Sequence, residues 1–288
     1  MAQSHELFGI RFDCLRMGEA VAKILAWCRA DDSFSCRFVV TPNVDHVVLF
    51  QEREALRAAY ADAAIVLVDG MPIVWASRLL RRRLPERVAG SDLVPALFEE
   101  VSSGEAPPPA GLAAAPASST PRDLKVFLLG ALPGIADAAA QRVHETWRGV
   151  SVVGTYSPPL GFEDDADENR RILKAVAAAE PDLLIVGLGA PKQELWTHRH
   201  RTELRTKVVL CAGAPIDFLG GARSRSPRWM RKVGMEWLHR LLSEPRRLAR
   251  RYARDAWVFP GLVWREWRSA GRLAVECSPA RERLGGQC

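Results

Sequence analysis

Apolar runs and helical patterns alternate along the chain, and this alternation predicts the fold class. Short runs rich in Val, Ile and Leu indicate strands that are buried on both faces. We expect six such strands, at residues 37–41, 64–68, 125–130, 151–154, 182–187 and 207–211. Apolar residues at helical spacing predict seven helices, at residues 17–29, 44–60, 72–82, 92–102, 133–147, 167–179 and 191–204. The sequence therefore predicts an α/β fold, with a Rossmann-like, mostly parallel sheet and helices on both faces.

Composition changes along the chain and indicates its domain organisation. Residues 105–121 are almost wholly Pro, Ala, Gly and Ser, which bury too little apolar area to order themselves, so we expect a flexible loop there. Residues 222–272 carry fourteen Lys and Arg against four acidic residues, and five of the nine tryptophans. We expect an α/β domain that holds the chemistry over 1–222, a basic, Trp-rich helical appendage over 223–272, and a disordered tail over 273–288.

Cysteine usage and hydropathy bear on the compartment. The six cysteines contain no C-x-x-C pair, so they indicate neither a zinc site nor a disulfide framework. We see no basic region followed by an apolar stretch and a small-residue cleavage site, and we expect no signal peptide. The late apolar run 257–264 is shorter than the roughly 20 residues that a membrane crossing needs. These features predict a cytoplasmic protein with reduced cysteines.

Polar residues follow four of the six predicted strands. Ligands of open parallel sheets bind beyond the carboxyl ends of the strands. Thr41 and Asn43 follow the first strand, Asp69 the second, residues 187–193 the fifth, and Asp217 the sixth. We expect these four exits to line one cleft.

The exit after the fifth strand is a glycine turn that leads into a helix. Gly187 and Gly189 allow backbone N–H groups to approach an anion, and the helix dipole favours negative charge at that point. Pro191 suits a first helical position, and Lys192 and Gln193 follow in the first turn. The spacing differs from the dinucleotide fingerprint, so the turn alone indicates an anion site without identifying the ligand.

Six ordered segments of the chain resemble the WecG/TagA/CpsF family of glycosyltransferases, over roughly residues 7 to 255. They are TPNVD (41–45), VDGMP (68–72), ERVAGSD (86–92), GLGAPKQE (187–194), GAPIDF (213–218) and PRWMRKVGMEWLHRLLSEPRR (227–247). Two departures are the loop at 105–121, which looks inserted, and Ile216, where an aromatic residue is common.

The resemblance implies an inverting, metal-independent transfer of a sugar from a UDP-sugar to a polyprenyl-diphosphate-linked saccharide. The donor would be like UDP-N-acetylmannosamine, or UDP-glucose or a UDP-uronic acid. The product would enter teichoic acid, capsule or exopolysaccharide. The protein would sit peripherally on the cytoplasmic face of the inner membrane and need no cofactor. A second copy of the chain is a further candidate partner.

The resemblance implies that Asp69 is the general base. An inverting transfer needs one carboxylate to take the proton of the attacking hydroxyl. The pattern of a strand, Asp69 and Gly70 fits equally well an aspartate that caps the helix beginning near Pro72. The match to the family's base position favours catalysis.

The resemblance also implies roles for other residues, each with a structural alternative. Thr41, Asn43 and Gln193 would line the pocket, although Thr41 and Asn43 also suit a helix cap. Arg87 would neutralise diphosphate, although three arginines precede it and it also fits a charged surface. Asp217 would bind the nucleoside, or cap a helix. The remaining substrate-binding candidates are Gly187, Gly189, Lys192, Arg228 and Arg231.

A metal site is not indicated. Asp165 and Asp167 have the D-x-D spacing of metal-dependent transferases, but they lie in an acidic run that suits a solvated helix N-terminus. His198 and His200 are two residues apart on a predicted helix and so point to different sides. Without a metal, backbone N–H groups and arginines must stabilise the leaving UDP.

The basic appendage admits three interpretations. Trp229, Val233, Trp237 and Leu241 form one apolar stripe of a predicted helix. Such a stripe packs against the body of the protein, or lies on an anionic membrane, whereas nucleic-acid binding is suggested by charge alone. The resemblance favours packing together with membrane docking, and no nucleic acid. A nucleotide-binding protein with a basic tail and no transferase activity is the alternative function.

Overall fold

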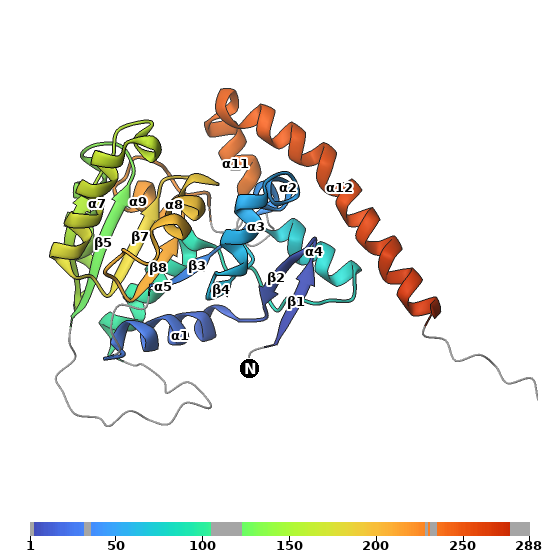
Figure 1. Ribbon diagram of the computed structural model, residues 1–288, viewed down its shortest axis with the longest axis horizontal. Coiled ribbons are helices and arrows are strands. Elements are labelled where there is room, and N and C mark those ends of the chain that lie inside the picture. The colour runs from blue at the N-terminus through green and yellow to red at the C-terminus, as the bar shows by residue number, and fades with distance from the viewer. Residues whose placement is uncertain (1–2, 32–35, 105–122, 228–229, 231–234, 277–288) are drawn as a thin grey trace, which may run out of the picture.

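The computed structural model describes residues 3–31, 36–104, 123–227, 230 and 235–276. Its centre is a six-stranded parallel sheet with the order β4-β3-β8-β7-β5-β6 (Figure 1). The strands are β3 (Arg37–Val40), β4 (Ile65–Val66), β5 (Leu124–Gly130), β6 (Val150–Tyr156), β7 (Leu183–Gly187) and β8 (Val208–Cys211). All six predicted strands are present, so the predicted sheet is confirmed.

Both faces of the sheet are buried. In β7, Leu183 and Ile185 belong to one hydrophobic core and Leu184 and Val186 to the other, because successive side chains point to opposite faces. The first core includes side chains of α1 (Met17–Arg29), α5 (Gly90–Ser103), α6 (Ile135–Thr146) and α9 (Pro215–Leu219). The second includes those of α2 (Val44–Glu52), α3 (Glu54–Ala61), α4 (Met71–Leu79), α7 (Ala166–Ala179) and α8 (Lys192–His200). The α/β class with helices on both faces is therefore confirmed.

An antiparallel hairpin, β1 (Ser4–Leu7) and β2 (Ile10–Asp13), was not predicted. Its turn residues Phe8 and Gly9 both have positive φ, at 58° and 81°, as the tight turns of hairpins require. Phenylalanine rarely adopts that conformation, so the sequence carries no usual turn signal. The Asp13 carboxylate accepts a hydrogen bond from the Val66 N–H at 2.9 Å and so fixes the hairpin beside β4.

Several predicted boundaries differ from the structure. The helix expected at 44–60 is divided into α2 and α3 at Arg53, whose backbone is extended (φ −119°, ψ 109°). Pro191 is the N-cap of α8, so the helix begins at Lys192, one residue after its predicted start at 191. The loop expected at 105–121 and residues 277–288 of the expected tail lie outside the described residues.

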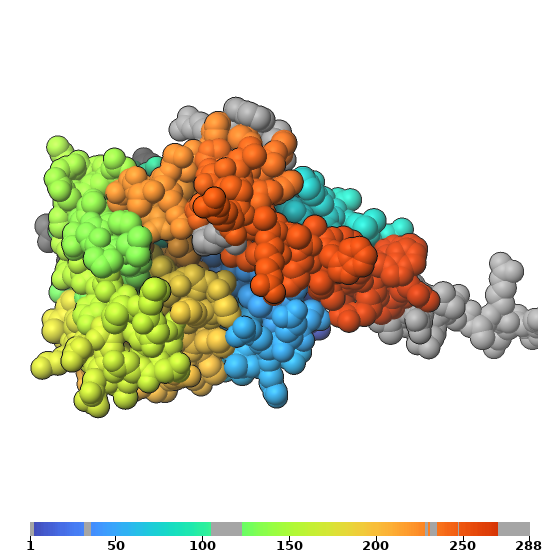
Figure 2. Space-filling model, turned by 90° about the horizontal axis from the view of Figure 1, so that it is seen from above, coloured from blue at the N-terminus to red at the C-terminus, as the bar shows by residue number. Residues whose placement is uncertain are grey.

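The appendage contains α11 (Glu236–Ser243) and α12 (Pro245–Glu276). In Figure 2, α12 crosses the molecule between the blue segment of α2 and α3 and the cyan segment that includes α4. Its Leu248 and Leu262 are buried, and the Phe259 ring lies 5.4 Å from that of Phe8. α12 thus packs against the body. Among the described helices, none is long and apolar enough to cross a membrane.

Candidate functional site

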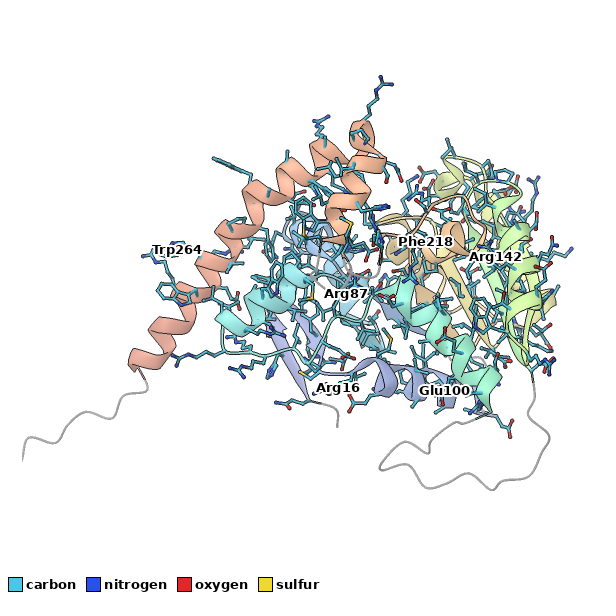
Figure 3. The ribbon with its side chains drawn as sticks, turned by 180° about the vertical axis from the view of Figure 1, so that it is seen from behind. Arg16, Arg87, Glu100, Arg142, Phe218 and Trp264 are labelled. Atoms are coloured by element: carbon cyan, nitrogen blue, oxygen red, sulfur yellow. The ribbon has the colours of Figure 1, made fainter. Side chains whose placement is uncertain are left out.

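The strand order brings the four predicted exits together, because β4, β3, β8 and β7 are consecutive neighbours. A cavity of about 430 Å³ lies beyond β3 and β4 and beneath α11 and α12. We call it the central cavity. It is lined by Asn43, Val44, Asp45, Asp69, Gly70, Met71, Pro72, Arg87, Glu236, Trp237, Arg240, Arg251, Tyr252, Asp255, Ala256, Phe259 and Pro260. Figure 3 shows Arg87 in the middle of the molecule, near the junction with the appendage.

Asp69 projects into the central cavity from the exit of β4. Its N–H donates to the Pro42 carbonyl at 2.9 Å, which fixes the backbone beside the exit of β3. The N-cap of α4 is Gly70, which has no side-chain capping bond. The structure therefore gives no support to the capping alternative for Asp69 and places its carboxylate in the cavity wall.

Arg87 connects the body to the appendage through its guanidinium group. Nη2 lies 2.6 Å from the Asp92 carboxylate, and Nη1 lies 2.9 Å from Glu236 on α11 and 3.8 Å from Asp69. The Arg87 side chain is only 15% exposed, so it is not a surface charge. Glu236 in turn accepts from Arg240 Nη2 at 2.9 Å. A buried chain of alternating charges therefore runs from Asp69 to α11.

This surrounding sets the pKa of Asp69. Burial disfavours the charged carboxylate and is the largest influence, and the negative charges of Glu236 and Asp92 act in the same direction. The positive charges of Arg87 and Arg240 oppose it but do not outweigh it. The net effect raises the pKa of Asp69 to about 6. For Glu236 the two arginines outweigh burial, and its pKa is lowered.

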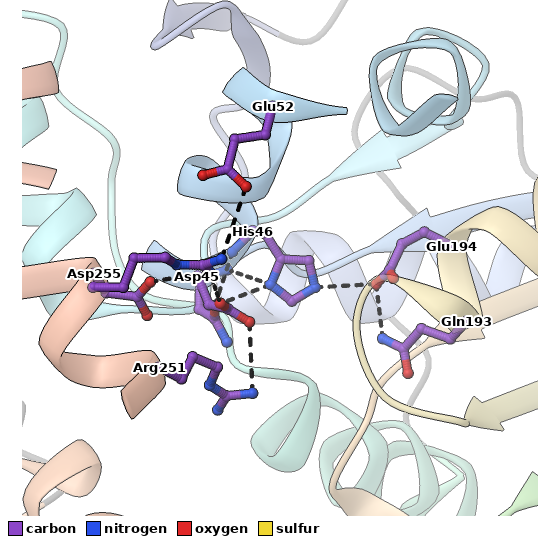
Figure 4. Close-up of polar contacts among 9 residues, drawn as sticks. Asp45, His46, Glu52, Gln193, Glu194, Arg251 and Asp255 are labelled. Atoms are coloured by element: carbon purple, nitrogen blue, oxygen red, sulfur yellow. Dashed lines mark hydrogen bonds and ion pairs between the residues drawn. The ribbon is translucent and has the colours of Figure 1, made fainter. Parts of the chain in front are cut away.

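A second charged cluster holds α12 against α2 (Figure 4). Asp45 accepts from Arg254 Nη2 at 2.7 Å, and its other oxygen lies 3.5 Å from Arg251 Nη1. Asp255, on α12, lies 3.4 Å from Arg254. Burial, followed by the charge of Asp45, raises the pKa of Asp255 to about 6, although Arg254 and Arg251 oppose the shift. The central cavity thus contains two carboxyl groups that titrate near pH 6.

Beneath the cavity, His46 connects the exit of β3 to α8 (Figure 4). His46 Nε2 lies 3.1 Å from a Glu194 carboxylate oxygen, which also accepts from Gln193 Nε2 at 2.8 Å. The His46 N–H donates to the Asn43 side chain at 3.3 Å, so Asn43 both caps α2 and lines the cavity. Burial alone would lower the pKa of His46, but the charges of Glu194 and its neighbours together raise it.

The structure places the remaining predicted residues outside the central cavity. Thr41 is buried, and its hydroxyl donates to the Cys211 carbonyl at 3.4 Å. Lys192 pairs with Glu163, and Asp217 lies 3.3 Å from Arg223. Gly187, Gly189 and Gln193 belong to the β7–α8 exit, behind the His46 pair. Arg228 and Arg231 lie outside the described residues.

Sequence reasoning missed several charged residues of the site. They are Asp45, His46, Glu194, Glu236, Arg240, Arg251 and Asp255. Asp45, Glu194, Glu236 and Arg240 lie within the segments that carry the family resemblance, which was a usable signal. His46, Arg251 and Asp255 lie outside those segments, and only the packing of α8 and α12 reveals their partners.

Two further hollows adjoin the central cavity. The arginine cavity, of about 380 Å³, shares Arg240 and Arg251 with it, and is lined also by Phe218, Ala222, Arg223, Ser224, His239, Ser243, Glu244 and Leu248. The apolar groove, of about 610 Å³, shares Pro72, Phe259 and Pro260 with it. Its other lining residues are Trp75, Ala76 and Leu79 of α4 and Val263, Trp264 and Trp267 of α12. The central cavity thus lies between a cationic and an apolar neighbour.

The described residues contain no group of three or more His, Cys, Asp or Glu side chains placed to hold a metal ion. Asp165 caps α7 by accepting from the N–H groups of Asp167 and Glu168. Asp167 pairs with Arg170, at 2.8 Å. The D-x-D spacing therefore belongs to a helix N-terminus.

Comparison with known proteins identifies relatives that match most of the chain. A model of the glycosyl transferase WecG/TagA/CpsF family matches residues 5–273. The chain is 27% identical, over 245 residues, to an N-acetylglucosaminyldiphosphoundecaprenol N-acetyl-beta-D-mannosaminyltransferase of Staphylococcus aureus strain MRSA252. The match covers 85% of this chain and 87% of that protein. The protein of the same name from strain MW2 is 26% identical over the same lengths.

The buried pair of His46 and Glu194 generates a prediction about stability. Replacing Glu194 by Gln should lower the free energy of unfolding by about 3 kcal/mol at pH 6, because a buried charge loses its partner. The folded-state pKa of His46 is raised, so the pair stabilises fully below the unfolded pKa, and less as pH rises through the folded value. Urea unfolding of wild type and variant should therefore differ more at pH 6 than at pH 9.

The matched control is Glu203→Gln, which removes the exposed partner of His200. It should change the free energy of unfolding by less than about 0.5 kcal/mol, because solvent screens exposed pairs. Equal losses for both variants, or a loss for Glu194→Gln that does not change with pH, would contradict the assignment of the buried ion pair.

Proposed function

This chain belongs to the WecG/TagA/CpsF family of glycosyltransferases, and on that premise we propose an inverting, metal-independent transfer from a UDP-sugar to a polyprenyl-diphosphate-linked saccharide. The named relatives act on N-acetylglucosaminyldiphosphoundecaprenol, which supports an acceptor with a lipid, a diphosphate and a sugar. Their name supports an N-acetylmannosaminyl donor, and UDP-glucose or a UDP-uronic acid is the competing donor. The product would enter a cell-surface polysaccharide such as teichoic acid or capsule.

The observation that carries the proposal is the position and pKa of Asp69. In an inverting transfer the acceptor hydroxyl attacks the anomeric carbon, a carboxylate takes its proton, and the bond to UDP breaks. A base is most effective when its pKa lies near the working pH, because it is then ionised and still accepts a proton readily. A carboxylate with a pKa of about 6 in a cavity wall meets that requirement.

We assign Arg87 a positioning role in this reaction. Its Nη1 donates to Glu236 and its Nη2 to Asp92, and Nη1 also lies 3.8 Å from Asp69. Such an arginine holds the base and supplies positive charge near it, and it stays a candidate for neutralising the diphosphate. The appendage contributes to the base through Glu236, and closure of α11 over the cavity assembles the charged chain.

The arginine cavity suits the diphosphate of the donor. Arg223, Arg240 and Arg251 line it together with one acidic residue, Glu244. Guanidinium groups bind phosphate oxygens in a bidentate manner and stabilise the negative charge that develops on the leaving UDP. Because Arg240 and Arg251 also line the central cavity, a donor bound there would present its sugar to Asp69. Arg228 and Arg231 remain candidates for the same task.

The exit of β7 would complete the donor pocket from the other side. Gln193 Oε1 and Glu194 Oε2 are buried and have no hydrogen-bond partner among the described residues. Unpaired acceptors of this kind suit the hydroxyl or amide donors of a sugar. We keep Gly187, Gly189, Lys192, Thr41 and Asp217 as proposed substrate-binding residues, although the structure places them outside the central cavity.

The appendage supports peripheral membrane association. Trp257, Trp264 and Trp267 on α12 are exposed, and residues 222–272 carry an excess of ten positive charges. Tryptophan prefers the interfacial zone of a bilayer, and each basic residue near an anionic surface contributes about 1 kcal/mol of attraction. We place this surface on the cytoplasmic face of the inner membrane, where lipid-linked acceptors would be reached.

Removing the base tests the proposal. Asp69→Asn should lower single-turnover transfer by roughly 10²- to 10⁴-fold, as general-base loss does, while the Kd for UDP stays within about threefold. Asp137→Asn, on the exposed surface of α6, is the control and should leave both values unchanged. If Asp69→Asn transfers sugar near the wild-type rate and Asp255→Asn loses transfer, the general base is Asp255 instead of Asp69.

The pH profile tests the raised pKa. Asp69 must be ionised to accept a proton, so kcat/KM should fall about tenfold per pH unit below pH about 6. Glu236→Gln removes a negative charge that raises the pKa of Asp69, so the acid limb should move to lower pH. A flat profile down to pH 5, or a limb that moves upward in Glu236→Gln, would contradict the proposed electrostatics.

Chelation tests metal independence. Transfer measured in excess EDTA should stay within about twofold of the untreated rate, because arginines in place of a Lewis acid stabilise the leaving group. If EDTA silences the enzyme and Mn²⁺ or Mg²⁺ restores it, the metal-independent mechanism is wrong. In that case Asp69 and Asp255, the two of the four cavity carboxyls whose pKa is raised to about 6, become candidate ligands, and Asp165 and Asp167 must be reconsidered.

A further inference from the structure

The apolar groove is a surface that the proposed transfer leaves without a role. Of the residues that the structure describes, no charged one lines it, and its walls are α4 on one side and α12 on the other. Trp75, Leu79, Trp264 and Trp267 are all exposed, and the rings of Trp264 and Trp267 stack at 5.3 Å. An exposed apolar hollow of this size marks a site for an apolar ligand or partner.

Its position relative to the reaction identifies the ligand. The groove shares Pro72, Phe259 and Pro260 with the central cavity, so an apolar chain lying in it would end at the cavity, with the groups attached to it extending toward Asp69. In Figure 3, Trp264 lies on α12 well away from Arg87 in the middle of the molecule, so the groove leads away from the charged residues of the central cavity. From Phe259 to Trp267 it follows α12 for about 12 Å, at the usual rise per residue.

We propose that the apolar groove binds the first isoprene units of the polyprenyl chain of the acceptor. This inference rests on the proposed function, because only a lipid-diphosphate-linked acceptor brings such a chain to the cavity. The arrangement orders the two substrates along one line. The donor diphosphate lies in the arginine cavity, the reacting hydroxyl at Asp69, and the lipid beside α4 and α12. The groove is too short for a long polyprenyl chain, whose remainder continues into the bilayer.

The groove would hold the lipid chain of the acceptor, which the polar cavities do not bind. The acceptor sugar and its diphosphate lie at the end of a long flexible lipid. Anchoring the chain next to the diphosphate limits how far the hydroxyl can move from Asp69, which raises the effective concentration at the base. The groove would therefore act on acceptor affinity and positioning while leaving donor binding unchanged.

The test uses prenyl diphosphates and the full chain, in detergent-free buffer below any micelle concentration. Isothermal titration calorimetry would compare inorganic, dimethylallyl, geranyl and farnesyl diphosphate. Each added isoprene unit should tighten binding by about tenfold, because partial burial of its carbons at the usual free energy per CH₂ suffices for that ratio. A Kd that does not change with chain length would overturn the proposal.

Substitutions in the groove test whether the groove causes the dependence of binding on prenyl chain length. The double variant Leu79→Gln/Trp264→Gln changes one exposed residue on each wall, at 60% and 58% exposure, so the fold should tolerate it. It should reduce the chain-length effect to less than about threefold in total, since the apolar contact is lost, and leave inorganic diphosphate affinity unchanged. Trp257→Gln, on the same helix but outside the groove and 87% exposed, should keep the wild-type series.

Sedimentation with vesicles of phosphatidylglycerol and phosphatidylcholine tests whether the apolar groove is occupied by a prenyl chain or by the bilayer. Loss of farnesyl diphosphate affinity in the double variant, with vesicle binding retained, supports the proposal. Loss of vesicle binding with the prenyl series intact overturns it and makes the groove a bilayer contact. Because calorimetry needs no turnover, a flat series with measurable sugar transfer rejects the groove alone, and a graded series without transfer rejects the proposed function alone.

Discussion

The arrangement of the site depends on one buried guanidinium group. Arg87 lies within reach of three carboxylates from three parts of the chain: Asp69 at a strand exit, Asp92 in α5 and Glu236 in α11. The cluster is partly buried, so removing one partner leaves a charge whose compensation by solvent is incomplete. Helix α11, Asp69 and the body are therefore held in one electrostatic unit, and the pKa of Asp69 reports on its integrity.

The same cluster explains why an enzyme of this kind would place part of its active site on an appendage. Without α11, Asp69 would lose the charges of both Glu236 and Arg240, which act on its pKa in opposite directions. Asp45 holds α12 in a similar way through Arg251 and Arg254. α12 then borders all three hollows, because Arg251 and Phe259 lie on one helix. A single helix thus contributes to the three hollows in which we propose that the donor, the base and the lipid lie.

Much of the fold follows from local patterns that the sequence displays. Leu183 to Val186 of β7 form a continuous apolar run because each residue is buried on one face of the sheet or the other. The hairpin was missed because Phe8 occupies a turn conformation that its residue type disfavours. The break at Arg53 was missed because the apolar pattern continues across it from α2 to α3.

Site residues that directly follow a strand could be predicted from the sequence. Site residues whose partners lie far away in the sequence could not. Asp69 and Asn43 line the cavity as expected from the strand exits. Glu236 meets Arg87 across 149 positions of sequence, and His46 meets Glu194 across 148. Local spacing carries no information about such pairs, because helix packing alone determines them. The raised pKa values of Asp69 and Asp255 come chiefly from burial, which depends on how the helices pack, and local spacing does not show them either.

The most direct test of the account is the chemical structure of the product. The full chain would be incubated with a panel of UDP-sugars and a lipid-diphosphate-linked N-acetylglucosamine, and the product analysed by mass spectrometry and by NMR of the anomeric proton. The account predicts one added sugar, from one preferred UDP-donor, with an anomeric configuration opposite to that of the donor. Retention of configuration, or no transfer from any UDP-sugar, would contradict it.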